Sequence, residues 1–180
     1  MRYFRLSLQF TLFITLFLFI ACAPTKFPTL WKDETFQRRP EKVLVINTFP
    51  NPASRRLFED EFVKALKDRR VDAVVSYNVM PDPVVDDKEA IAGQANSVGA
   101  DSVLINRPIG ATTHENTAIY GVTYGDLYVN TQTNFYDMKL NRVVLSTTAE
   151  TVIPQGESYP SHIQSYVIDL VNKLSQAGLF

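Results

Sequence analysis

Apolar and polar residues recur along this chain with two different periods, and the change of period separates predicted strands from predicted helices. The run from Lys42 to Phe49 is almost continuously apolar, which is typical of a strand buried on both faces. The Asn51-Pro52 pair predicts a helix that runs to about Arg70, because Asn caps helix starts and Pro suits the first turn. Its apolar side chains recur at spacings of three and four, and we expect them to face the core: Leu57, Phe58, Phe62, Ala65 and Leu66.

The opposite face of this predicted helix is charged. It carries Arg55, Arg56, Glu59, Asp60, Lys64, Lys67 and Asp68. Such a face is typical of a solvated helix surface, on which ion pairs contribute little to stability. We therefore expect all of these side chains to lie in water.

Further elements follow at regular intervals. A strand is predicted over residues 71–79, and a second helix should begin at Asp86, where Asp86 and Glu89 form a capping box. A third strand covers residues 100–108. After a polar, turn-like stretch and a short strand over residues 118–122, residues 127–136 alternate between two faces, as a half-exposed antiparallel strand does. A returning strand over residues 143–153 and a closing helix over residues 158–178 complete the pattern.

The predicted order of elements is β-α-β-α-β-β-β-α. Two βα units followed by a meander indicate a mixed sheet of about five strands, with its helices mainly on one face. The fold class is α/β, shading to α+β. Residues 42–180 are long enough to form a single domain with its own core.

The N-terminal segment has a different pattern. Arg2 and Arg5 precede a long apolar run from Leu6 to Ala21, which has the form of a secretory signal peptide over residues 1–21. An uncleaved membrane anchor is one alternative, but the run is shorter than the roughly 20 apolar residues that a spanning helix needs. A plain signal peptide, with Ala21-Cys22-Ala23 as its small-residue cleavage site, is the other alternative.

The end of this segment, Phe19-Ile20-Ala21-Cys22, resembles the lipobox of bacterial lipoproteins. The resemblance implies that the Cys22 sulfur receives a diacylglycerol and that cleavage makes Cys22 the new N-terminus. Acyl chains such as palmitate would then hold the protein in the lipid bilayer. Inner-membrane lipoproteins of Gram-negative bacteria usually have Asp at the position of Ala23. The resemblance therefore also implies an outer-membrane location, with the domain facing the periplasm.

The cysteine content and the net charge argue against internal disulfides and against a nucleic-acid partner. Cys22 is the only cysteine, so the chain forms no internal disulfide, and acylation gives the single thiol a role. The chain has 18 basic and 19 acidic residues, a formal net charge of −1. This balance argues against a nucleic-acid partner, since nucleic-acid binders carry a basic face.

Residues 22–41 are predicted to be the lipidated N-terminus and a tether. They contain Pro24, Pro28 and Pro40 and show no clear period, which suits a linker. They also contain Phe27, Leu30, Trp31 and Phe36, which a flexible spacer would lack. We expect the second half to lie over the domain as a strap. The alternative is that Trp31 sits at the membrane interface or in a partner's pocket.

Two segments resemble a group of bacterial envelope lipoproteins. One is Ala95–Ile105, in which a helix, Gly99-Ala100-Asp101 and an apolar strand follow one another, and the other is Asn134–Ser146, with a Tyr-Asp strand end, a turn and a second strand. The group includes the curli secretion channel lipoprotein, the activators of penicillin-binding proteins and the N-terminal domain of the Tol translocation β-propeller protein. This chain departs from the group at Leu145, which is usually Trp, and at Asn141, which is usually Gly. The resemblance implies an envelope lipoprotein.

The sequence shows no catalytic constellation. His114 and His162 are far apart, and neither lies in a nucleophile, zinc or phosphate-loop motif. We therefore expect no enzyme activity, no cofactor and no metal. The expected function is a non-catalytic binding or regulatory module for another envelope protein, and the alternative is a subunit of an oligomeric secretion or envelope assembly. Tyrosines make good interface anchors, and four are candidates for partner binding: Tyr120, Tyr124, Tyr128 and Tyr136.

Overall fold

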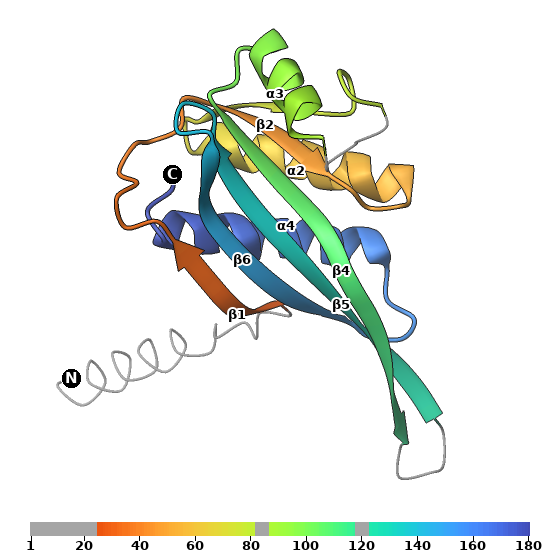
Figure 1. Ribbon diagram of the computed structural model, residues 1–180. Helices are drawn as coiled ribbons and strands as arrows, with labels where there is room; N and C mark the ends of the chain where they lie inside the picture. Colours follow the sequence, from red (N-terminus) through yellow and green to blue (C-terminus); the bar gives the residue numbers. More distant parts are fainter. Residues whose placement is uncertain (1–24, 82–86, 118–122) are drawn as a thin grey trace, which may run out of the picture.

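A computed structural model of the chain describes residues 25–81, 87–117 and 123–180, and the predicted lipidation residue Cys22 lies outside these ranges. Six strands form one mixed sheet in the order β1-β6-β5-β4-β2-β3 (Figure 1). The strands are β1 (Thr25–Lys32), β2 (Lys42–Asn47), β3 (Asp72–Val75), β4 (Ser102–Thr117), β5 (Thr123–Asp137) and β6 (Arg142–Ile153). The helices are α2 (Pro52–Asp68), α3 (Lys88–Ser97) and α4 (Tyr159–Gln176).

The mixed α/β class is confirmed, but the expected strand number and order are wrong. The sixth strand, β1, lies in the segment predicted to be a tether and pairs antiparallel with β6, where Thr25 is opposite Thr151 and Lys32 is opposite Leu145. Residues nearby in the sequence gave no sign of this pairing, because the partner strand is more than 100 residues away. Pro28 weakens the local strand pattern further, since proline is tolerated only at sheet edges and bulges.

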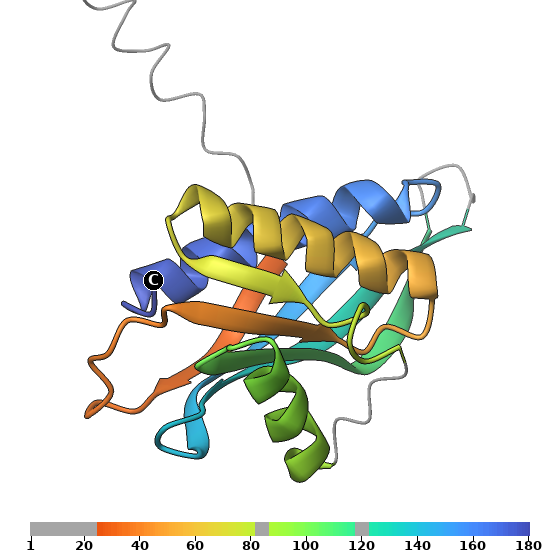
Figure 2. The same cartoon turned by 90° about the horizontal axis from the view of Figure 1, so that it is seen from above.

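The helices divide between the two faces of the sheet (Figure 2). α2 and α4 pack on one face, which we call the inner face, over Val45, Leu104, Phe135 and Leu145. α3 packs alone on the opposite, outer face, against the ends of β2 and β4. The larger core therefore lies between the sheet and the α2–α4 pair. Among the described residues, no helix is both long and apolar enough to cross a membrane.

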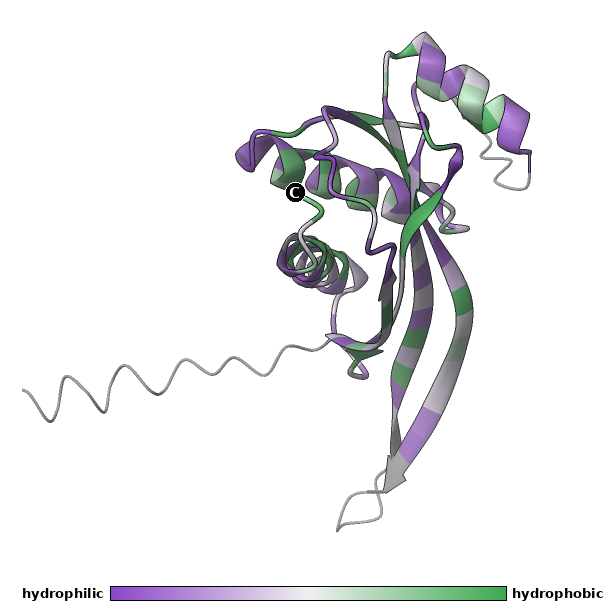
Figure 3. Ribbon diagram, turned by 60° about the vertical axis from the view of Figure 1, so that its left-hand side comes forward, coloured by the Kyte–Doolittle hydropathy of each residue, from purple (hydrophilic) through white to green (hydrophobic). Residues whose placement is uncertain are grey.

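β4 and β5 are longer than predicted and run beyond the rest of the sheet as a hairpin (Figure 3). The polar stretch around His114 was expected to be a turn, but it pairs with β5 at Asp126. Polar residues suit a strand here because the hairpin stem has no helix over it. A Cβ added to Gly125 would lie 2.8 Å from Thr113 Cγ2, so a larger residue there would require the Thr113 side chain to shift.

Two helix starts follow from their capping residues. Asn51 Oδ1 accepts hydrogen bonds from the backbone N–H groups of Ala53 and Ser54, at 2.9 and 3.0 Å, as predicted. α3 is capped by Asp87, which accepts from the N–H groups of Glu89 and Ala90, and not by Asp86, which lies outside the described residues. The prediction was one residue early because either aspartate can cap.

The charged face of α2 is not fully solvated, which corrects the expectation for Arg55 and Glu59. Glu59 has no exposed surface, and Arg55 is 7% exposed. Glu59 accepts from Arg55 Nε at 3.0 Å and from the N–H groups of Asn47 and Ser76, at 3.0 and 2.7 Å. The carboxylate thus joins α2 to the ends of β2 and β3. In the sequence, only the four-residue spacing of Arg55 and Glu59 indicated that these two side chains could interact.

Two aspartates from the segments that resemble envelope lipoproteins, Asp101 and Asp137, connect the chain after β1 to the sheet. Arg38, from the segment after β1, pairs with both Asp101 and Asp137. Asp101 also accepts from the N–H groups of Glu41 and Lys42. Burial raises the pKa of Asp101, but these hydrogen bonds and Arg38 outweigh it, and the pKa lies below its ordinary value. Asn141, at the expected glycine position, has φ 52°, which Asn tolerates better than most residues.

Candidate functional site

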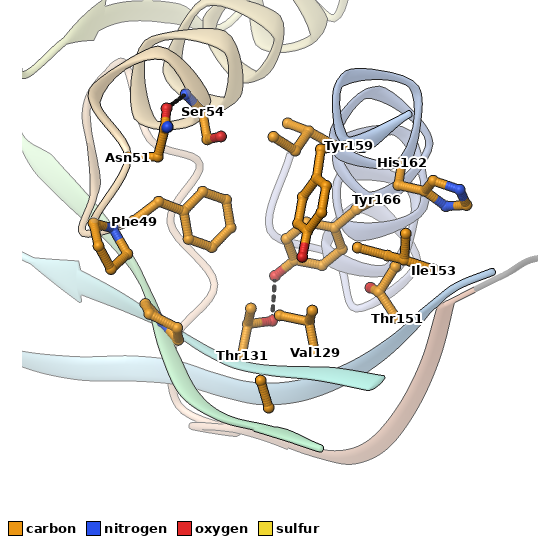
Figure 4. A pocket seen from close by; sticks show the side chains of 14 residues that line it. Phe49, Asn51, Ser54, Val129, Thr131, Thr151, Ile153, Tyr159, His162 and Tyr166 are labelled. Atoms are coloured by element: carbon orange, nitrogen blue, oxygen red, sulfur yellow. Dashed lines mark hydrogen bonds between the residues drawn. The ribbon is translucent and has the colours of Figure 1, made fainter. Parts of the chain in front are cut away.

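A cavity of about 300 Å³ lies between the inner face of the sheet and the N-terminal ends of α2 and α4 (Figure 4). The strands contribute Pro108, Ala111, Val129, Thr131, Thr151 and Ile153, and the helices and the loop before α2 contribute Phe49, Pro50, Asn51, Ser54, Tyr159, His162, Ile163 and Tyr166. Most of these side chains present carbon to the space. A mostly apolar hollow of this size lies at the lower end of the range of small-molecule sites.

The size of the strand side chains explains why the space is open. Further along the same two layers, Phe135, Leu145, Leu170 and Leu174 fill the gap between helix and sheet, and none of them has exposed surface. At the cavity, the strand positions carry smaller side chains such as Ala111 and Thr151. Protein interiors normally have few voids larger than a water molecule. The cavity therefore results from the small side chains that the strands carry at one end of the inner face.

A buried polar cluster closes the floor of the cavity. The Tyr166 hydroxyl lies 2.7 Å from Thr131 Oγ1 (Figure 4). Asn106 Nδ2 donates to the Tyr166 oxygen at 2.6 Å. Asn106 Oδ1 accepts from Asn47 Nδ2 at 2.9 Å. Full burial raises the pKa of Tyr166 despite hydrogen bonds from its neighbours. These polar groups satisfy one another, and they join strands β2, β4 and β5 to α4.

His162 forms part of the wall and is only 8% exposed. Its Nε2 lies 2.6 Å from Glu157 Oε2, and its Nδ1 is buried without a hydrogen-bond partner among the described residues. Ser161, beside it, donates instead to the backbone oxygen of Ser158 at 2.7 Å. The Ser161-His162 pair therefore belongs to the start of α4, as its position in the sequence suggested.

Strand β1 begins beside this wall. Thr25 Oγ1 lies 3.3 Å from Oγ1 of Thr151, a residue that lines the cavity. In Figure 4 the start of β1 lies next to the end of β6 that carries Thr151 and Ile153. On α4, burial raises the pKa of Asp169, although a hydrogen bond from Thr25 lowers it in part. The first described residue of the chain is thus packed against both the sheet and α4.

The four candidate partner-binding tyrosines do not form one described patch. Tyr120 and the side chain of Tyr124 lie outside the part of the chain that the structure describes, and the backbone of Tyr124 belongs to β5. Tyr128 and Tyr136 share the outer face of β5. Tyr136 lies eight positions after Tyr128, which corresponds to about 27 Å along the strand. The Tyr128 ring meets the His114 ring edge-on with centroids 4.6 Å apart. Tyr136 packs against the α3 core and lines a second cavity of about 390 Å³ under that helix.

The segment predicted as a tether divides into buried and exposed parts. Phe36 is 3% exposed and belongs to the inner core. Leu30 and Trp31 are 41% and 54% exposed, so strand β1 presents two large apolar side chains to its surroundings. The cavity residues and this exposed pair are the strongest site candidates outside the four tyrosines. The alternation of residues 127–135 predicted a core-facing stripe at Val129 and Thr131, but not that this stripe borders a hollow.

No protein-family model and no curated protein matches the sequence, whereas solved structures match its fold. The PelC dodecamer from Paraburkholderia phytofirmans matches with a TM-score of 0.55 and 16% identity over 83% of this chain and 96% of that one. Lipoprotein GNA1162 from Neisseria meningitidis matches with a TM-score of 0.51 and 15% identity over 76% of this chain and 99% of that one.

These likenesses concern the fold, since the identities are low. They confirm the expected resemblance in its broader form, because the domain has a fold that occurs in a bacterial lipoprotein. They give no support to the narrower group of the curli channel lipoprotein, the penicillin-binding protein activators and the Tol protein. We conclude that the chain has an α/β fold similar to that of these two proteins, with a cavity at one end of the inner face of its sheet.

Proposed function

We propose that this protein is a cell-envelope lipoprotein, anchored in the outer membrane through acylated Cys22, whose periplasmic domain is a non-catalytic subunit of an assembly of identical copies. The observation that carries the proposal is the short distance along the chain between Cys22 and strand β1, which begins at Thr25. Three residues can span at most about 10 Å. The domain would therefore sit directly at the bilayer, without a long flexible spacer.

Close attachment favours lateral association. Copies held this way share one plane and one restricted range of orientations, so each presents the same edges to its neighbours. Confinement raises their effective concentration, and a repeated head-to-tail contact closes into a ring when its rotation permits. A fold neighbour that was solved as a dodecamer, PelC, supports this proposal.

The exposed side chain of Trp31, on edge strand β1, is the contact that we favour. Tryptophan is enriched among residues that dominate binding energy. Strand-to-strand addition at this edge is disfavoured by Pro28, by the bulge between Lys26 and Thr29 and by the lysine side chains. We therefore expect neighbouring copies to make contact through the Trp31 side chain and not through backbone pairing with β1.

A second candidate function is that of a binding module for a different envelope protein. The outer-face pair of Tyr128 and His114 favours it, because these rings lie on the hairpin that extends beyond the sheet, away from β1. Absence of catalysis is part of both proposals. In support of it, the polar groups at the cavity floor, Asn106, Thr131 and Tyr166, are engaged with one another rather than poised toward the space.

Native mass spectrometry of the full chain, produced with its signal segment and extracted from membranes in mild detergent, tests the proposal. The wild-type protein should give complexes of several acylated copies, and Trp31→Ser should shift them to single chains. Ile168→Ser is the matched control, because Ile168 is 58% exposed on α4 and should leave the assembly intact. Single acylated wild-type chains would reject self-association and favour the second candidate.

A further inference from the structure

We propose that the cavity on the inner face takes one acyl chain of the protein's own Cys22. This inference rests on the proposed acylation of Cys22. It places one of the acyl chains in the cavity and leaves the others in the bilayer. It follows from two features of the described residues: the chemistry of the cavity lining and the position at which β1 begins.

The lining suits a hydrocarbon chain. Val129, Ile153, Ile163 and Phe49 present carbon to a space of about 300 Å³. Dry apolar cavities bind apolar molecules rather than water. A volume at the lower end of the small-molecule range suits one chain and not the several chains of a fully acylated lipoprotein cysteine. The remaining chains would stay available to the membrane.

The connection from Cys22 is short enough to reach the cavity. Thr25 lies against Thr151, which lines the cavity, with 3.3 Å between the two hydroxyl oxygens. Thr25 lies three positions after Cys22, a span of at most about 10 Å. An acyl chain adds its own length to this reach. A chain attached at Cys22 would therefore start within reach of the β6 wall of the cavity.

Photo-crosslinking in intact cells tests this inference. Cells that produce the full chain are fed a fatty acid carrying a diazirine and irradiated, and the adducts on the protein are mapped by mass spectrometry. We expect adducts within one chain on Val129, Ile153 and Ile163. Val129→Trp, which fills the cavity, should reduce these adducts to background. Val152→Trp is the matched control, because Val152 points to the opposite face of the sheet and should leave them unchanged.

The readouts separate this inference from the proposed function. The mass of the N-terminal peptide reports acylation of Cys22 directly. An acylated peptide with adducts confined to residues outside the cavity, or with adducts that link two chains, would overturn the inference and leave the lipoprotein proposal standing. A peptide without acyl groups would overturn both. Should Val129→Trp fail to fold, Ala111→Trp blocks the same space from β4 and gives the same test.

Discussion

The inner face of the sheet is packed at one end and hollow at the other, although the same two helices cover both ends. At the packed end Phe135 and Leu145 on the strands meet Leu170 and Leu174 on α4, with no exposed surface on any of them. At the hollow end the strands carry Val129, Thr131 and Thr151, and a cavity of about 300 Å³ remains. The comparison indicates that the packed end provides stability and that the hollow end is available for binding.

Truncating a core side chain at each end should give the largest contrast. Leu145→Ala at the packed end should lower the free energy of unfolding by about 3 kcal/mol, through lost transfer energy and a new void. Val129→Ala at the hollow end should cost about 1 kcal/mol or less, because the valine already borders empty space. Urea unfolding of the two variants measures both values. Equal losses would show that the two ends do not differ in packing.

Enlarging a side chain should give the reverse contrast. Val45→Phe introduces a ring where no space exists, since Val45 has no exposed surface, and overpacking should cost about 2 kcal/mol. Val129→Phe should change stability by less than about 1 kcal/mol, because the ring can enter the cavity. The midpoints of thermal unfolding compare the two variants. A large loss for Val129→Phe would argue that the hollow is not open to a ring.

Removing one hydroxyl tests the cavity floor. Tyr166→Phe leaves Asn106 and Thr131 each short of one buried hydrogen bond and should cost about 1 kcal/mol. Tyr159, also on the cavity wall, is 51% exposed, and Tyr159→Phe should change stability by less than about 0.5 kcal/mol. Chemical denaturation of both variants gives the difference. A neutral Tyr166→Phe would mean that the cluster does not hold the floor together.

Two aspartates should respond to acid with opposite signs. The pKa of Asp101 is lower in the folded chain than its ordinary 3.8, so its stabilisation is present above that value and is lost as the pH falls through the folded pKa. The pKa of Asp169, beside β1, is raised, so its charging lowers stability as the pH rises above 3.8.

The smallest expected effects come from removing these charges. Asp101→Asn should destabilise the chain at pH 7, with a deficit that shrinks in acid. Asp169→Asn should stabilise it slightly at pH 7, with an advantage that vanishes below pH 3.8. Melting temperatures between pH 3 and pH 7 reveal both trends. Parallel curves for the two variants would contradict these assignments.

The packed end was easier to predict from the sequence than the hollow end. Leu66 and Leu174 recur with helical spacing, and Phe135 lies on an alternating strand, so each local pattern indicated burial. The hollow depends on which small strand residues face each other across β4, β5 and β6, and register is a tertiary property. β1 was missed for the same reason, because its partner lies far away in the sequence. Glu59 was misplaced because a charged side chain predicts solvent unless its buried partners are known.

The candidate partner-binding tyrosines stay a prediction, and the structure adds only where two of them lie. Tyr128 and Tyr136 share a face, as the alternation required, but distance along β5 separates them. His162 lies within the closing helix that was predicted over residues 158–178, and the structure adds that it lines a cavity. Leu30 and Trp31 were seen as unusual for a linker, yet only the pairing of β1 with β6 shows that they lie on an ordered edge.

The most direct test of the central proposal is the mass of the N-terminal peptide of the protein isolated from the outer-membrane fraction. A lipoprotein anchored beside its domain predicts a peptide that begins at Cys22 and carries a diacylglycerol on sulfur. Cys22→Ser should abolish the acyl mass while leaving the fold of residues 25–180 unchanged by circular dichroism. A wild-type peptide that begins at Met1 or Ala23, or an unmodified Cys22, would contradict the proposal.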